Sequence, residues 1–179
     1  MSRDKQPSIA ERTGIVRDAA GAPLLLAHRT QEQFDFLDPA KTVDGGLHFG
    51  TLEQATMRAG KQSRLIRAYL LASRLRRCKD TGGNWKALIA SAKRAGMDGI
   101  VYLNRYEGIT TEVIARLSAS GELQRLDAMT DAQFRKAVPE AVDSFIVFTA
   151  EQVLVHDEDG LPDSPADKQL DQPCGDLDS

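Results

Sequence analysis

The sequence predicts an α+β domain, in which short strands and helices follow one another without the regular order of a parallel α/β fold. Four apolar segments read as strands or strand edges, each with a polar residue at its rim: 25–30, 46–51, 96–102 and 143–148. Helical segments lie between them, but no β-α-β alternation is visible. The phosphate-binding signatures GxGxxG and GxxxxGK followed by Ser or Thr are absent. Doubly wound dinucleotide folds and P-loop enzymes are therefore excluded.

The first half of the chain contains three predicted strands and one well-marked helix. The strands are expected at 13–16, 24–28 and 47–49, and the helix at 52–60. Thr51 is a good N-cap, Gln54 stands at the capping-box spacing from it, and Gly60 is a typical C-terminal stop. Residues 63–78 fit a period of 2 or of 3.6, and their many good helix formers favour a helix.

The second half begins with a clearer amphipathic helix over residues 84–95, which Gly96 ends. Its apolar face is formed by Trp85, Leu88, Ile89 and Ala92. The Asp98-Gly99 pair is typical of a turn and leads into a strand over 100–103. A helical insertion follows over residues 110–140, within which Thr130 caps a helix at 131–138. Two last strands are expected at 145–148 and 152–155.

We predict three parts of the chain: a polar arm at 1–13, a domain at 14–156 and a tail at 157–179. The net charge distinguishes the tail from the rest. The tail holds eight acidic residues against one lysine, with three prolines and little to bury. Such a composition predicts disorder. The remaining 156 residues hold 22 basic and 18 acidic residues. The tail is therefore interpreted as a solvated segment, or as an acidic cover for a basic cleft.

Size and composition favour a cytoplasmic protein with no membrane partner. The 179 residues suit one domain with a full core, and 41% are hydrophobic against 27% charged. No stretch approaches the roughly 18 apolar residues of a membrane helix, and residues 1–13 lack the apolar part of a secretory signal. Cys78 and Cys174 form no metal or redox spacing, which fits a reducing compartment. Delivery into another cell by a dedicated system stays compatible with these features.

Polar and aromatic residues at the strand ends are the candidates for chemistry. His28 ends an apolar strand, where one ring N–H can be donated to a ligand hydroxyl or amide. Phe49 ends another strand and is read either as a stacking surface or as core. Asp143 and Ser144 begin a buried strand and lie on opposite faces if that strand is regular. Glu107, just beyond Asn104, is a further carboxylate candidate. No metal-ligand cluster is visible.

Taken together, these segments resemble the ADP-ribosyltransferase superfamily, in particular its compact bacterial and phage-borne members. The resemblance covers residues 22–155 apart from the insertion. It includes the strand ending His28-Arg29-Thr30, the Gly45-to-Ala55 segment and the Asp98-to-Asn104 run. It implies a split mixed β-sheet with flanking helices, and it favours a strand over 66–72. The implied activity is NAD-dependent mono-ADP-ribosyl transfer, a glycosyltransferase reaction in which nicotinamide is released.

The resemblance also implies roles for particular residues. The NAD ribose would be held by His28, with Arg29 and Thr30 beside it, and the nicotinamide would lie between His48 and Phe49 near Gly46. A carboxylate would stabilise the oxocarbenium-like transition state. Relatives often carry Glu at the position of Ser144, so the candidates here are Asp143, Ser144 and Glu107. The acceptor implied by the resemblance is a macromolecule, and specifically a protein, as for a toxin or a phage effector.

Two other hypotheses stay open. Arg29 replaces a family glycine and Ser144 a family acid, which favours an inactive module of the same fold that binds a protein or a nucleotide. Five arginines between residues 64 and 77 are interpreted as a solvated face, or as contacts to the pyrophosphate, to a macromolecular target or to nucleic acid: Arg64, Arg67, Arg74, Arg76 and Arg77. A nucleic-acid-binding or nuclease domain ranks last, because interleaved aromatics and a metal-ligand cluster are missing.

Overall fold

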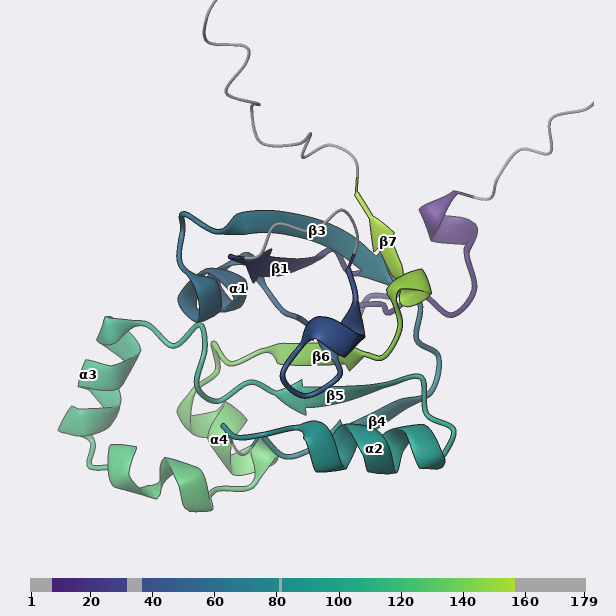
Figure 1. Cartoon of the computed structure of the whole chain (residues 1–179). Helices are drawn as coiled ribbons and strands as arrows, with labels where there is room; N and C mark the ends of the chain where they lie inside the picture. Colours follow the sequence, from purple (N-terminus) through teal and green to yellow (C-terminus); the bar gives the residue numbers. More distant parts are fainter. Residues whose placement is uncertain (1–7, 32–36, 81, 157–179) are drawn as a thin grey trace, which may run out of the picture.

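Two separate β-sheets and several helices form a mixed α+β structure (Figure 1). The computed structural model describes residues 8–31, 37–80 and 82–156. The predicted acidic tail at 157–179 and the start of the predicted arm lie outside these residues. No helix of the described part is long and apolar enough to span a membrane.

The first sheet has three antiparallel strands in the order β1-β3-β7. These strands are β1 (Leu26–Thr30), β3 (Arg64–Leu70) and β7 (Val153–Val155). The second sheet has four strands in the order β2-β6-β5-β4, and only its β4–β5 pair is parallel. Its strands are β2 (Leu47–Phe49), β4 (Leu75–Cys78), β5 (Gly99–Leu103) and β6 (Asp143–Val147).

The helices are α1 (Leu52–Ala59), α2 (Lys86–Arg94), α3 (Thr111–Ala119) and α4 (Asp131–Ala137). The helix α2 lies on the outer side of the second sheet, α1 lies beside the first sheet, and α3 and α4 lie at one end of the molecule (Figure 1). Short 3-10 turns occur at Ile9–Glu11, Pro39–Lys41, Leu123–Ala128 and Ala150–Gln152. The helix α1 packs beside β1 and α2 packs on β5.

Local signals account for the elements that position the cleft. The capping box predicted at Thr51 is present: its hydroxyl accepts from Gln54 N at 3.2 Å, and the Gln54 side chain accepts from Thr51 N at 2.8 Å. Gly60 ends α1 with a φ of 80°, a conformation that a β-carbon disfavours. The helix therefore has the start and the end that the sequence predicts.

The prediction of a helix over residues 63–78 is wrong, because this segment forms β3 and β4. Alternate residues of β3 are buried, and the strand is flanked by partners on both sides. Tertiary pairing thus overrides the helix propensity of the segment. The carboxylate of Asp98 holds the turn between the two strands by accepting from Ser73 N at 3.0 Å and Arg74 N at 2.8 Å.

Residues 13–16 form only an isolated bridge from Ile15 to Leu71, so the short strand expected there is also wrong. The other predicted elements differ from the observed ones at their ends. The strand expected at 24–28 is shifted to Leu26–Thr30, and the one expected at 152–155 begins at Val153. The helix expected at 84–95 is Lys86–Arg94.

The predicted helical insertion contains α3, α4 and a small core of its own. Its buried side chains are Val113, Leu117, Phe134 and Val138, which pack with Leu103 of β5. Arg105 fastens this unit to the sheet: its guanidinium, only 2% exposed, donates to Asp131 at 2.6 Å and lies 4.7 Å from the centre of the Phe134 ring. The insertion therefore supports the loop that follows β5.

A bridge between Ala27 and Gly50 joins the two sheets where β1 passes β2. Ala27 N donates to Gly50 O at 2.8 Å, and Gly50 N donates to Ala27 O at 3.0 Å. The apolar core between the sheets includes Leu26, Phe49 and Phe145. This bridge places the side chain of His28 next to β2.

Candidate functional site

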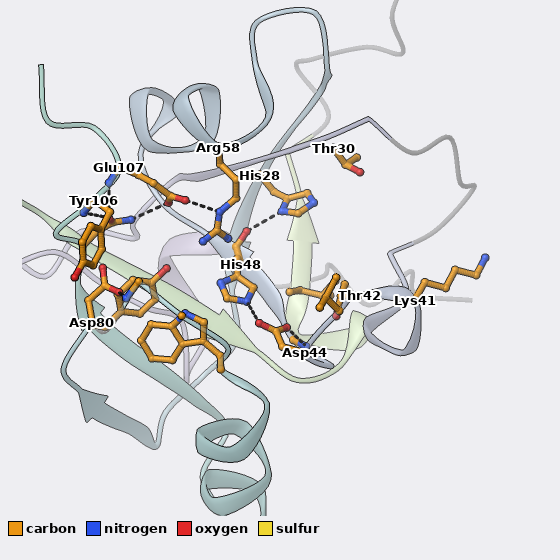
Figure 2. Close-up of a pocket in the computed structure, with 18 of the residues that line it drawn as sticks. His28, Thr30, Lys41, Thr42, Asp44, His48, Arg58, Asp80, Tyr106 and Glu107 are labelled. Atoms are coloured by element: carbon orange, nitrogen blue, oxygen red, sulfur yellow. Dashed lines mark hydrogen bonds and ion pairs between the residues drawn. The ribbon is translucent and has the colours of Figure 1, made fainter. Parts of the chain in front are cut away.

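A cleft of about 420 Å³ is lined by residues from both sheets and from the loop at 38–46 (Figure 2). Its lining includes His28 and Thr30 of β1, His48 of β2, and Arg58 of α1. Asp80, Trp85, Tyr102 and Glu107 complete the side formed by the second sheet. The volume lies within the range of about 300–1,000 Å³ that is typical of small-molecule sites.

The His28 imidazole has a defined tautomer. Its Nδ1 lies 2.7 Å from the carbonyl oxygen of His48, which can only accept, so Nδ1 carries the hydrogen. Burial lowers the pKa of His28, and the hydrogen bond to the His48 carbonyl offsets this only in part. Neutral His28 therefore has a lone pair on Nε2. A ligand must donate to that atom, which corrects the expectation that His28 donates a hydrogen to the ligand.

The lowered pKa predicts a pH dependence of folding. Below the ordinary value of 6.5, His28 takes up a proton in the unfolded chain but not in the folded one. The free energy of unfolding should therefore fall as the pH decreases below 6.5, until the lower pKa of the folded state is reached. Urea titrations between about pH 5 and pH 8 measure this. His28→Gln should flatten the slope, and equal slopes in both proteins would contradict the prediction.

The two residues after His28 point in different directions, as alternation along a strand requires. Thr30 lines the cleft (Figure 2). Arg29 instead donates to the carbonyl oxygens of Lys61 at 3.1 Å and Ser63 at 2.7 Å, on the segment between α1 and β3. The structure therefore does not bring the Arg29 guanidinium into the main cleft.

Gly46, Leu47 and His48 line the cleft, whereas Phe49 does not. Gly46 lines it, and a β-carbon at this position would lie 2.4 Å from Ile146 Cγ2 and 2.8 Å from Ile89 Cδ1. His48 projects its ring into the cleft (Figure 2). Phe49 is 2% exposed and belongs to the core between the sheets, with its ring centre 5.4 Å from that of His28. Phe49 therefore supports the His28 ring from behind and does not line the main cleft.

Of the three candidates for the catalytic acid, only Glu107 lines the cleft. Its Oε1 accepts from Arg58 Nε at 2.7 Å and its Oε2 from Asn104 Nδ2 at 3.0 Å (Figure 2). Asp143 lies outside the cleft, where its carboxylate pairs with Arg77 and Arg135. Ser144 is 2% exposed and points into the protein. The two neighbours thus lie on opposite faces of β6.

A buried hydrogen-bond network links Ser144 to the cleft carboxylate. Asn104 Nδ2 donates to Ser144 Oγ at 2.9 Å as well as to Glu107, and Ser144 Oγ donates to Gln54 Oε1 at 3.0 Å. Asn104 Oδ1 in turn accepts from Glu107 N at 2.9 Å and Tyr106 N at 3.2 Å. Asn104 is 2% exposed and Gln54 3%. The network fixes the position of Glu107 from both its backbone and its side chain.

Arg58 and three aromatic residues are part of the cleft that sequence reasoning did not assign to it. Trp85 and Tyr102 lie side by side, with ring centres 4.4 Å apart, and Tyr106 is 48% exposed beside them. Burial raises the pKa of Tyr102 to about 12, so its phenol stays protonated. Burial alone would lower the pKa of Arg58, but the charge and hydrogen bond of Glu107, together with Tyr102, reverse this and raise it. The cleft thus contains a permanent cation beside an aromatic surface.

The five arginines between residues 64 and 77 do not line this cleft. Arg74 pairs with Asp98 at 3.3 Å, Arg76 donates to Ser91 at 2.9 Å, and Arg77 pairs with Asp143. In addition, no group of three or more His, Cys, Asp or Glu residues suited to a metal ion occurs in the described part of the chain.

Comparisons of the chain with models of protein families, with curated proteins and with solved structures found no match. The geometry of the cleft is therefore the basis for a functional conclusion.

Proposed function

We propose that this chain is an NAD-dependent mono-ADP-ribosyltransferase with an ADP-ribosyltransferase-like fold. The observation that carries the proposal is the joint presence of His28, Arg58 and Glu107 in one cleft between two sheets. These side chains suit three features of NAD that a transferase must bind or stabilise. The features are the ribose hydroxyls, the pyrophosphate and the positive charge that develops at the reacting ribose. The split sheets and the helical insertion at 110–140 also support the fold.

For each of these three features of NAD, the cleft contains a side chain that could bind or stabilise it. The Nε2 lone pair of His28 would accept from a ribose hydroxyl, and Thr30 is available beside it. The Arg58 guanidinium would bind the pyrophosphate, because its planar fork suits phosphate oxygens. The half-exposed ring of Tyr106 offers an aromatic surface for the nicotinamide, whose positive charge favours such contact, and the buried rings of Trp85 and Tyr102 support the wall of the cleft.

The reaction would begin when the bond between the ribose C1′ and the nicotinamide nitrogen breaks. The bond electrons leave with nicotinamide, and positive charge develops on the ribose. The Glu107 carboxylate would stabilise that charge, as an acidic residue does in glycoside hydrolysis. The acceptor then forms the new bond to C1′. The sequence resemblance extends the proposal to a macromolecular acceptor, which we take to be a protein.

The test is a calorimetric titration with NAD together with an assay of released nicotinamide. Wild-type protein should bind NAD saturably and release nicotinamide slowly, and His28→Ala should lose both while its melting temperature stays near that of the wild type. His156→Ala is the matched control, since His156 packs on Tyr69 and does not line the cleft. Absence of NAD binding by a folded wild-type protein would contradict the proposal.

One observation favours a second function, that of a non-catalytic nucleotide-binding module. Both carboxylate oxygens of Glu107 already accept hydrogen bonds, and Ser144 stands where relatives often have an acid. In such a module the Arg58–Glu107 pair would serve only to shape the cleft. Saturable NAD binding without any release of nicotinamide, in water or with added acceptors, would select this function.

A further inference from the structure

The cleft holds a second acid–base group, formed by Asp44 and His48, that the reaction described above does not use. His48 Nε2 lies 2.9 Å from Asp44 Oδ2 (Figure 2). The other oxygen of Asp44 accepts from Gly46 N at 3.1 Å, so the carboxylate is held in place by the turn that leads into β2. Both side chains are largely buried, with exposed fractions of 12% for His48 and 13% for Asp44.

This pairing determines which ring nitrogen of His48 is basic. Burial alone would raise the pKa of Asp44, but the hydrogen bond and charge of His48, the amide of Gly46 and the charge of Arg58 together outweigh it and lower the pKa, so Asp44 is ionised. An ionised carboxylate only accepts, and Nε2 therefore carries the hydrogen. In the neutral ring the lone pair is then on Nδ1. That atom is buried and has no hydrogen-bond partner among the described residues.

The surroundings of His48 direct it toward the reaction. Its ring meets the edge of Trp85 with centres 6.5 Å apart, and both residues line the cleft. Its backbone carbonyl holds the His28 imidazole, so β2 positions both histidines in the cleft. Glu107, in contrast, is held by Arg58 and Asn104, which donate hydrogen bonds to its two carboxylate oxygens. The cleft thus separates a charge-stabilising group from a proton acceptor, as paired groups in active sites do.

We infer that His48 is the general base that takes a proton from the acceptor, that Asp44 is its positioning residue, and that the acceptor is a hydroxyl. The inference rests on the proposed transferase function. As the C1′–nitrogen bond of NAD breaks and nicotinamide leaves with its electrons, the acceptor oxygen bonds to C1′. The hydroxyl proton passes to His48 Nδ1, and the Asp44 carboxylate balances the charge of the imidazolium.

A hydroxyl acceptor needs such a base, whereas a carboxylate acceptor does not. A carboxylate acceptor is already an anion and would need no base, whereas a hydroxyl becomes a good nucleophile only when its proton is removed. The burial of Nδ1 also favours a slender reacting group, such as a serine or threonine side chain or a water molecule. The Asp44–His48 pair therefore indicates the chemical class of the acceptor, which the binding of NAD alone does not indicate.

The experiment compares NAD cleavage in water, with methanol and with sodium azide, and identifies the products by mass spectrometry. Methanol is a neutral hydroxyl probe, and azide is an anionic nucleophile that needs no base. In His48→Gln, which keeps the backbone carbonyl that holds His28, transfer to water and methanol should fall by about 10²-fold or more. Transfer to azide should stay close to the wild-type rate, and the dissociation constant for NAD should be little changed.

Two further variants show whether an observed loss comes from the missing base or from a general effect of the substitution. Asp44→Asn should show the same pattern with a smaller loss, and it serves as the second variant if His48→Gln folds poorly. His156→Gln is the control, because the Nδ1 of His156 is also buried without a partner yet lies outside the cleft. Full methanol transfer by His48→Gln, or an equal loss with methanol and azide, would contradict the role of His48 as general base. Neither result would contradict the proposed transferase activity. A wild-type protein that never releases nicotinamide would overturn both.

Discussion

Glu107→Gln should lower the rate of nicotinamide release at saturating NAD by about 10²- to 10³-fold, which is the usual cost of removing one electrostatic stabiliser from an active site. The amide keeps the shape of the side chain but has no charge to oppose the cation that forms at C1′. Binding should not suffer, because Arg58 loses its ion-pair partner and becomes more available to the pyrophosphate. The result expected is a lower kcat with an unchanged or smaller dissociation constant for NAD.

The matched control for this change is Glu112→Gln, a carboxylate in the first turn of α3 that does not line the cleft. It should keep the wild-type kcat. Single-turnover measurements separate cleavage from product release and therefore show whether the chemical step is affected. If Glu107→Gln cleaves NAD at the wild-type rate, the carboxylate does not stabilise the transition state.

Asn104→Ala should lower the free energy of unfolding by about 2–4 kcal/mol, the range expected when a buried hydrogen-bond network is broken. The change removes both donors to Ser144 and Glu107 and the acceptor for two backbone N–H groups. Equilibrium urea unfolding measures the loss. Since Glu107 would no longer be held, nicotinamide release should also fall in the fraction that stays folded.

Asn84→Ala is the control for Asn104→Ala. Its side chain accepts from Lys86 N at 2.8 Å in an exposed position before α2, so its loss should cost only about 1 kcal/mol. Equal effects at the two positions would show that the buried network adds nothing beyond a single surface hydrogen bond.

Elements with strong local signals were predictable from the sequence. The capping box at Thr51 and Gln54 and the stop at Gly60 depend on neighbours within a few residues, and α1 follows from them. The segment from 64 to 78 was not predictable in the same way. Its apolar residues fit a period of 2 as well as one of 3.6, its helix formers favour the helix, and pairing with β1 and β7 makes β3 the better state.

Only some of the residues that the sequence predicts for the site lie at the cleft. His28, Thr30, Gly46, His48 and Glu107 line the cleft, whereas Asp143 and the ring of Phe49 do not. Which face of a strand meets the cleft depends on how the two sheets pack, and the sequence alone does not contain that information. In the sequence, Trp85 is one more apolar residue on the face of a predicted helix, and Arg58 is an ordinary basic residue near the end of another.

The helical insertion connects β5 and β6, which are adjacent antiparallel strands of the second sheet. Leu103, the last residue of β5, pairs with Asp143, the first residue of β6, and Asn104 N donates to Val142 O at 3.1 Å. In topological terms the insertion is a greatly enlarged hairpin loop. The entropic cost of closing a loop grows only slowly with its length. Evolution can therefore exchange or enlarge this unit without shifting the strand register, provided that Arg105 keeps an anchor for the loop that carries Glu107.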